Sequence, residues 1–275
     1  MPDRSVLESL AYVNWTLLFS LALGATAMAV ALRHMTDATT GYLGFTAGTA
    51  AVLAGLTAFL DGSLPIPVNL AVATPSPELA QARSIGLVVF TIMLVLETIA
   101  LRRGHGRRLG LVAVAAGLAT IAFAALGWGS APLPSPVIAA QLLVLSGVTG
   151  GVLAAMILGH WYLVTPKLTE GPLILAVRLL LAALVVQAVV VVGSIAVGLG
   201  AEAPFAALTG QYLFLVWLLL GVGIVFPIVL TVMALRTART RSMESATGLL
   251  YIDTAAVLAG TIVSAALLFG AGLVV

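Results

Sequence analysis

Residues 172–199 read PLILAVRLLLAALVVQAVVVVGSIAVGL, a stretch with one charged side chain, Arg178, and one carboxamide, Gln187. It exceeds the roughly 20 apolar residues that an α-helix needs to cross the hydrocarbon core of a bilayer. Leu, Val and Ala occur in runs, without the alternation of polar and apolar residues that marks a barrel strand. The stretch therefore predicts a membrane-spanning helix.

Seven further segments have the same character. Hydrophobic residues make up 61% of the chain and charged residues 8%, which is too few charges to cover a water-soluble protein of 275 residues. The sequence predicts an all-α, polytopic bundle of eight membrane-spanning helices that forms one integral membrane domain over residues 1–275. The expected spans are 8–32, 41–60, 84–102, 109–128, 137–162, 172–199, 211–236 and 246–273.

The basic residues gather in alternate connections between these spans. Because Lys and Arg near helix ends resist translocation, the connections that hold them are expected on the cytoplasmic side. Both termini then lie outside, and the expected location is the inner (plasma) membrane of a bacterial-type cell, with the lipid bilayer as the first partner. The residues concerned are Arg33 and His34, then Arg102, Arg103, His105, Arg107 and Arg108, then Lys167, and last Arg236, Arg239 and Arg241.

Eight helices divide into four plus four, and short sequence matches accompany this division. Ala100-Leu-Arg102 ends the third span, and Ala234-Leu-Arg236 ends the seventh. A parallel repeat of halves 1–130 and 131–275 would explain these matches. Chance explains them equally well, because an arginine after an apolar helix already follows from the charge rule.

Two pairs of glycines have the GxxxG spacing that favours close helix packing. They are Gly44 with Gly48 in the second span and Gly147 with Gly151 in the fifth. Small residues let two helix backbones approach each other. We therefore expect tight helix contacts at these two pairs.

Several chemistries are excluded by the residues themselves. The chain has no cysteine, so it supplies no disulfide, no thiolate for a metal or an iron–sulfur cluster, and no cysteine nucleophile. It has no phosphate-binding glycine loop and no HExxH metalloprotease motif. Its basic loops are explained by topology, so no nucleic-acid partner is expected. Nothing in the sequence identifies an independent catalytic activity.

Three ionisable residues fall inside the expected spans. Glu97, Arg178 and Asp253 all lie in the half of the membrane that faces the basic loops. Charged groups are costly in a bilayer, so each is a candidate for function. Glu97 or Asp253 would serve as the coupling carboxylate of a transporter, whereas Arg178 and Asp253 would join His160 and Tyr162 in a quinone or haem niche. If packing brought them together, the arginine would neutralise one or both carboxylates, which equally describes a structural ion pair.

The string Gly159-His160-Trp161-Tyr162 closes the fifth span at the basic side. Trp and Tyr favour that depth because their rings are amphipathic, which accounts for Trp161 and Tyr162 as interfacial residues. It accounts less well for His160, which is a candidate to bond a quinone carbonyl or to ligate haem iron. A single b-type haem would require His34 as the second ligand. We therefore take His160, Tyr162 and His34 as the candidate cofactor-binding residues.

Two classes of function fit these observations. The first is a membrane subunit of a respiratory or other electron-transfer complex, which is either structural or forms a quinone niche, less readily a b-haem niche, near the cytoplasmic side. Other membrane or redox subunits would then be its partners. The alternative is a proton- or cation-coupled secondary transporter using Glu97 or Asp253. Against transport stands the half of the membrane away from the basic loops, which the sequence predicts to be nearly dry.

Overall fold

The computed structural model describes residues 4–104, 108–131, 133–165 and 168–274, with the side chains of residues 4–7 left out of the description. Every regular element in these ranges is helical, and eight of the described helices are long and apolar enough to cross a membrane. The chain is therefore an all-α, multi-pass membrane protein, as its composition predicts.

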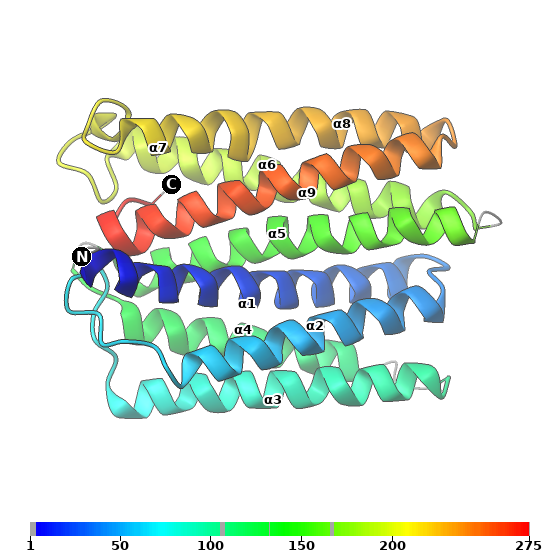
Figure 1. Cartoon of the computed structure of the whole chain (residues 1–275), viewed down its shortest axis with the longest axis horizontal. Helices are drawn as coiled ribbons and strands as arrows, with labels where there is room; N and C mark the ends of the chain where they lie inside the picture. The colour runs from blue at the N-terminus through cyan, green and yellow to red at the C-terminus, as the bar shows by residue number, and fades with distance from the viewer. Residues whose placement is uncertain (1–3, 105–107, 132, 166–167, 275) are drawn as a thin grey trace.

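The eight spans run side by side, as Figure 1 shows. The seventh span changes helix type along its length, and the eighth ends in a π-helical turn. A short 3-10 helix, η1 (Ala206–Leu208), precedes the seventh span. The spans are α1 (Arg4–Met35), α2 (Thr40–Asp61), α3 (Pro77–Arg102), α4 (Leu109–Trp128), α5 (Ser135–Val164), α6 (Gly171–Val197), α7 (Leu213–Leu218) with the π-helical turn η2 (Leu219–Val225) and α8 (Phe226–Arg239), and α9 (Met243–Ala266) with η3 (Leu267–Ala271).

The expected spans agree with the helices except at some ends. The largest difference is at α3, which begins at Pro77 and not at residue 84. Ser76 caps the helix, since its side chain accepts a hydrogen bond from the backbone N–H of Leu79, and Pro77 occupies the first turn. Hydropathy alone overlooks this start because the first turns of α3 are polar and extend beyond the apolar stretch.

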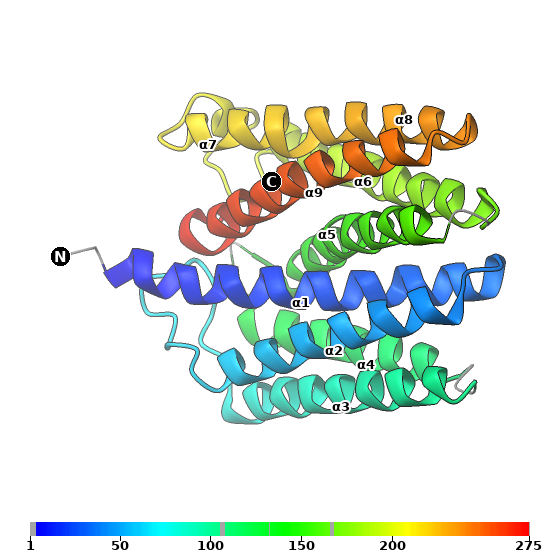
Figure 2. The ribbon, with the colours of Figure 1, turned by 45° about the vertical axis from the view of Figure 1, so that its right-hand side comes forward.

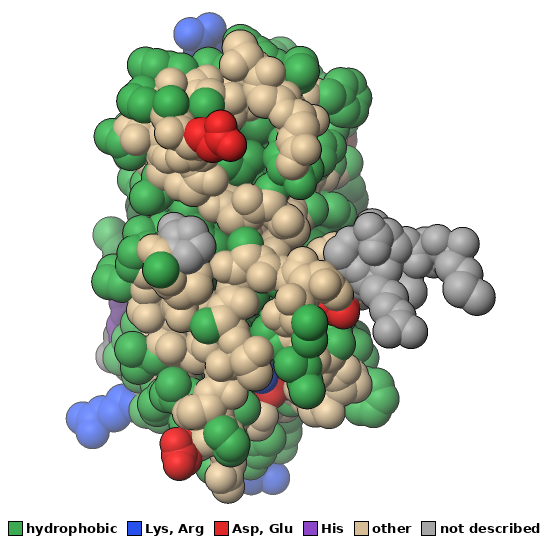
Figure 3. All heavy atoms as spheres, turned by 90° about the vertical axis from the view of Figure 1, so that its left-hand side faces the viewer, with side chains coloured by type: hydrophobic (Ala, Val, Ile, Leu, Met, Phe, Trp, Pro, Cys, Tyr) green, Lys and Arg blue, Asp and Glu red, His purple; other side chains and the backbone are tan. Residues whose placement is uncertain are grey.

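The two ends of the bundle differ in charge. The N- and C-termini both lie at the left in Figure 1, and we call this the terminal end. The last turns of α1, α3 and α8, which carry Arg33, Arg102 and Arg236, lie at the opposite, basic end. Figure 3 looks onto the terminal end, where uncharged and hydrophobic side chains predominate. His105, Arg107 and Lys167 lie outside the described residues. Which end faces the cytoplasm stays a prediction.

Helices α1 and α5 lie side by side at the centre of the bundle in both ribbon views (Figures 1 and 2). In each of these two helices 72% of the most apolar stretch is buried, against 28% in α3. Within each half the neighbour order is the same: α1 contacts α2 and α4 as α5 contacts α6 and α9, while α3 lies against α2 and α4 as α8 lies against α6 and α9. The 4+4 repeat itself stays a prediction.

The closest approach between the halves is a contact of helix backbones. A Cβ atom added to Gly24 in α1 would overlap Ser146, and one added to Gly150 in α5 would overlap the backbone of Gly24 and Ala25. The two predicted GxxxG pairs are not such crossings. The nearest atom to a Cβ on Gly44 would be Leu101 Cβ at 3.9 Å, and on Gly147 it would be Ala183 Cβ at 3.6 Å. Both are ordinary contacts, so that expectation is wrong.

Replacing Gly150 by Ala tests the contact between the halves. The added methyl group has backbone and no flexible side chain in front of it, so α1 and α5 must separate. We expect the free energy of unfolding to fall by about 1–3 kcal/mol, the usual cost of overpacking. The control is Gly193→Ala in α6, where no atom lies within 4 Å of the added Cβ. Equal stability of the two variants in detergent unfolding would contradict the contact.

Candidate functional site

The three intramembrane charges predicted from sequence do not meet. Glu97 on α3 is buried and pairs instead with Arg33 on α1, with 3.9 Å between Arg33 Nη1 and Glu97 Oε1. The first turn of α4 leaves room for this carboxylate because residue 110 is glycine, and a Cβ there would overlap Glu97. This pair joins α1 and α3 at the basic end, and α4 packs against its carboxylate.

Arg178, the third of these charges, is not part of an ion pair with either carboxylate. Its side chain is exposed on the surface of α6, and within the described ranges no carboxylate is found in an ion pair with it. A long arginine side chain near a helix end can carry its guanidinium along the helix to the membrane interface. Arg178 therefore neutralises neither Glu97 nor Asp253, and the predicted three-residue cluster is not formed.

Asp253 is completely buried on α9. Thr231 on α8 donates a hydrogen bond from Oγ1 to Asp253 Oδ2 over 2.6 Å. The other carboxylate oxygen, Oδ1, has no hydrogen-bond partner among the described residues. Asp253 is thus a single carboxylate within the interior of the second half, held by one hydroxyl group.

The three predicted cofactor-binding residues do not lie together either. His34 and His160 are both exposed, at the ends of α1 and α5, and no contact between them is found in the described part of the chain. A bis-histidine haem requires two imidazoles that face each other across a buried slot, so this arrangement does not favour one. Tyr162 is buried, and its hydroxyl donates to the backbone carbonyl of Thr169 over 2.5 Å. It links the end of α5 to Thr169 and is not among the residues that line the groove at His160.

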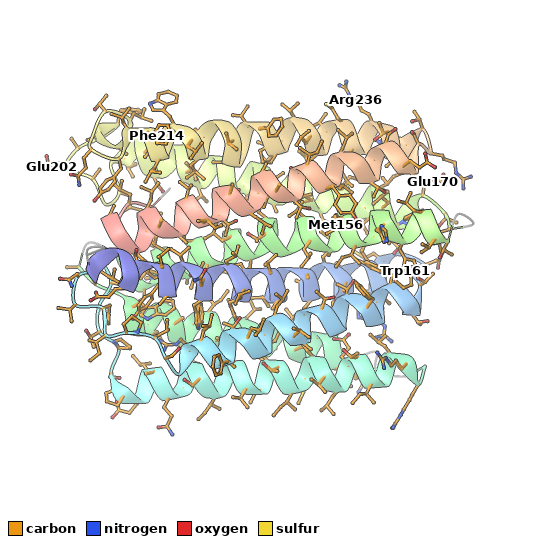
Figure 4. All side chains as sticks on the ribbon, viewed as in Figure 1. Met156, Trp161, Glu170, Glu202, Phe214 and Arg236 are labelled. Carbon is orange, nitrogen blue, oxygen red and sulfur yellow. The ribbon has the colours of Figure 1, made fainter. Side chains whose placement is uncertain are left out.

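His160 instead lines a groove between α5, α2 and α9 near the basic end. The groove has a volume of about 430 Å³. Tyr251 on α9 lies opposite His160, with 3.3 Å between the Tyr251 hydroxyl and His160 Nδ1 and the two rings edge to face. Two of the lining residues, Met156 and Trp161, are labelled in Figure 4. The groove is lined by Phe45, Met156, Ile157, His160, Trp161, Val164 and Tyr251.

A second hollow of about 340 Å³ continues the groove toward the basic end. The two hollows share Phe45 and Trp161, whose ring centroids are 6.2 Å apart. The indole of Trp161 lies across the start of α2, where a Cβ on Gly41 would be only 2.7 Å from Trp161 Cζ2. Arg102 lines the outer hollow. The groove thus has a His–Tyr pair at its inner end, aromatic rings at its middle and a cation at its outer end.

Tyr251 is the groove residue that sequence reasoning missed. It carries the polar group that His160 needs as a partner, yet it lies in an apolar stretch with no motif around it. Its depth offered a signal, since Tyr251 lies eight residues from the start of α9 and His160 four from the end of α5, both near the basic end. Depth alone does not show that two side chains share a face.

No family model, no curated protein and no solved structure matches this chain. The function is therefore argued from the site itself.

A second polar cluster, which the sequence analysis also missed, lies at the terminal end of the first half. Asp61, at the end of α2, and Arg83, on α3, form a buried ion pair with 2.7 Å between Arg83 Nε and Asp61 Oδ1. Trp15 donates to Asp61 Oδ1 over 2.8 Å, and Ser84 donates to Asp61 Oδ2 over 2.5 Å. The guanidinium lies 5.0 Å from the ring centroid of Trp128. One carboxylate therefore connects α1, α2 and α3.

The connection between α2 and α3 is held over this cluster. Tyr12 donates from its hydroxyl to the carbonyl of Pro65 over 2.8 Å, and the backbone N–H of Ala73 donates to the carbonyl of Trp128 over 2.9 Å. Asp61 ends α2 directly before this proline-containing connection, and Arg83 lies in the second turn of α3 after it. Their opposite charges on either side of the connection were the available signal, but a connection of that length is usually taken to be exposed.

The ion pair predicts a large loss of stability when one partner is removed. Asp61→Ala leaves a buried guanidinium without its carboxylate, so we expect the free energy of unfolding to fall by about 3–5 kcal/mol. The double variant Asp61→Leu with Arg83→Met removes both charges and should recover most of that loss. Unfolding in mixed micelles measures both. A single variant as stable as the wild type would show that the pair contributes nothing.

Because Arg178 is exposed, we expect its replacement to leave the stability of the protein unchanged. Arg178→Leu should leave the melting temperature in detergent unchanged within about 1 °C, because a surface substitution away from special contacts usually changes stability by less than about 0.5 kcal/mol. The matched comparison is Arg33→Leu, which removes the partner of the buried Glu97 and should destabilise the protein. A fall in stability for Arg178→Leu alone would mean that Arg178 pairs with a buried carboxylate after all.

Proposed function

We propose that this protein is a membrane subunit of an electron-transfer assembly, and that the groove around His160 and Tyr251 holds the ring of a quinone. The observation that carries the proposal is the pairing of these two polar groups inside an otherwise apolar and aromatic groove. By the distribution of basic residues this groove lies on the cytoplasmic side of an inner (plasma) membrane.

The groove suits a quinone in shape and chemistry. Its volume falls in the range of about 300–1,000 Å³ that small-molecule sites occupy. It lies between spans, and the partly exposed side chains along it allow a lipid-soluble molecule to enter sideways from the bilayer. Phe45 and Trp161 offer faces for ring stacking, while the Tyr251 hydroxyl and the His160 imidazole supply hydrogen bonds for a carbonyl oxygen.

The same groups can serve the reduction of a quinone. A quinone takes up two electrons and two protons to become a quinol, and each proton goes to a carbonyl oxygen. The His160 imidazole can carry a proton to the carbonyl oxygen, and Tyr251 bonded to it can pass a proton onward. The electrons would come from a redox partner subunit, since this chain has no cysteine with which to hold an iron–sulfur cluster. A quinone is favoured over a b-type haem because His34 and His160 do not face each other.

Proton- or cation-coupled transport is the second candidate, and one observation favours it. The interface of α5 and α9 holds two buried polar pairs. Thr149 and Thr261 are 2.7 Å apart near the middle of α5, and Gln141 and Ser264 are 2.6 Å apart nearer the terminal end. The interior there is more polar than the sequence analysis expects. Of the two predicted coupling carboxylates, Glu97 is paired with Arg33, which leaves Asp253 as the one without a cation.

Quinone binding is tested by titrating the purified protein with a short-chain quinone and following the quenching of tryptophan fluorescence. Trp161 lies in the groove and reports binding directly. We expect His160→Ala and Tyr251→Phe each to weaken binding about tenfold, the effect of one lost hydrogen bond of roughly 1.4 kcal/mol. The matched control is His34→Ala, an exposed histidine at the same end. Unchanged affinity in both groove variants would place the quinone elsewhere or nowhere on this chain.

A further inference from the structure

Asp253 lies well inside the eighth span. It is the eleventh residue of α9, so it stands about 15 Å along the helix from the basic end, in a span of 29 residues that is longer than the hydrocarbon core, roughly 30 Å thick. None of its surface is exposed. Its single described hydrogen bond comes from Thr231 on α8, and Oδ1 is without a partner in the described ranges.

No cation faces this carboxylate in the part of the chain that the structure describes. On α9 itself, Tyr251 points to the groove and Glu244 is exposed near the start of the helix. The titratable side chains that the structure describes on the elements packed against α9 all lie elsewhere. On α8 Arg236 and Arg239 are exposed, and on α5 His160 bonds to Tyr251 and Tyr162 bonds to Thr169. On α1 Arg33 pairs with Glu97, His34 is exposed, Tyr12 bonds to Pro65 and Glu8 accepts from Asn69.

An ionised carboxylate cannot be accommodated cheaply in such a place. Isolated charges in a medium of low dielectric constant are strongly disfavoured, and one hydroxyl group does not offset that cost. A metal ion is no better suited to the site, because Asp253 and Thr231 offer three oxygen atoms whereas a hard cation such as Ca²⁺ takes six or more. A proton on Oδ1 removes the charge and keeps the bond from Thr231 to Oδ2. The ligand that fits is therefore a proton.

We infer that Asp253, with Thr231, forms a proton-binding site inside the membrane, and that the α8–α9 contact responds to its occupancy. This inference goes beyond the quinone proposal and does not depend on it. Losing the proton would place a charge between α8 and α9, and only a separation of these helices would admit water to solvate it. Proton binding and the packing of α8 on α9 are thereby linked.

The local structure of the seventh span fits such a response. Between α7 and α8 the chain forms the π-helical turn η2, and π-helical turns often occur at functional sites. Gly223 in this turn lies against Gly260 of α9, since a Cβ on Gly260 would be 2.6 Å from Gly223 Cα. Pro227 follows directly, and it has no N–H to continue the helix hydrogen bonding. The span is thus irregular where it meets α9, one to two turns from Thr231.

Infrared spectroscopy of the purified protein tests the proton. The aspartates are labelled with ¹³C at the carboxyl carbon, and the carbonyl stretch of a protonated acid is sought at neutral pH. We expect an isotope-shifted band that disappears in Asp253→Asn and stays in Asp61→Asn, because Asp61 is paired with Arg83. Absence of the band in the labelled wild type would overturn the inference, and this outcome does not depend on whether any variant folds. So would a band that persists unchanged in Asp253→Asn.

The response of α8 and α9 is tested by the distance between two spin labels. The chain has no native cysteine, so Val229→Cys on α8 and Ile252→Cys on α9, both exposed side chains, can be labelled without background. We expect the distance to increase at alkaline pH as the infrared band is lost, and to stay constant in Asp253→Asn. A distance that does not change while the band disappears would overturn the link between proton and packing.

Discussion

The backbone contact between α1 and α5 is the constraint on which the rest of this structure depends. Between these two helices, at Gly24 and Gly150, no side chain intervenes, so neither helix can rotate or slide without a clash. The groove around His160 draws one wall, Phe45, from the first half and the others from α5 and α9. Tyr42 on α2 also donates to the carbonyl of Ala154 on α5 over 3.2 Å, across the same boundary. The geometry of the candidate site therefore follows from how closely the halves meet.

The helices themselves were predictable because the bilayer leaves the backbone no alternative. In hydrocarbon every N–H and C=O must be satisfied within the segment, so a long apolar stretch has to be helical. The gathering of arginines at one end followed from the same sequence. The start of α3 was not predictable from hydropathy. Ser76 and Pro77 set this start through a capping hydrogen bond and a fixed backbone angle, which hydropathy does not measure. Where a helix ends and where it enters the lipid are therefore encoded by different residues.

The faces of the helices were not predictable, and most of the errors about the site come from that. Lipid is as apolar as the protein interior, so a helix such as α6 is hydrophobic all round and its outward side is not marked. Arg178 lies outward although its charge suggests an inward partner, and Glu97 finds Arg33 instead. For the same reason the sequence did not show that His160 and Tyr162, two residues apart on α5, have different surroundings. His160 lines the groove, whereas Tyr162 is buried and bonds to Thr169. The prediction of close helix contacts from the GxxxG spacing failed for the same reason, because the spacing does not indicate which face of the helix the glycines occupy.

Tyr251 and Asp253 show what this geometry means for chemistry. They are two residues apart on α9, which in an α-helix turns their side chains about 200° from each other. Tyr251 therefore faces the lipid-side groove and Asp253 the packed interface with α8. If the groove holds the proposed quinone, that quinone cannot draw protons directly from Asp253 through the body of the helix. Its protons would have to come along the His160 side from the basic end, whereas the proposed exchange at Asp253 requires α8 and α9 to part. The two proposed sites are separate in space, so neither proposal depends on the other.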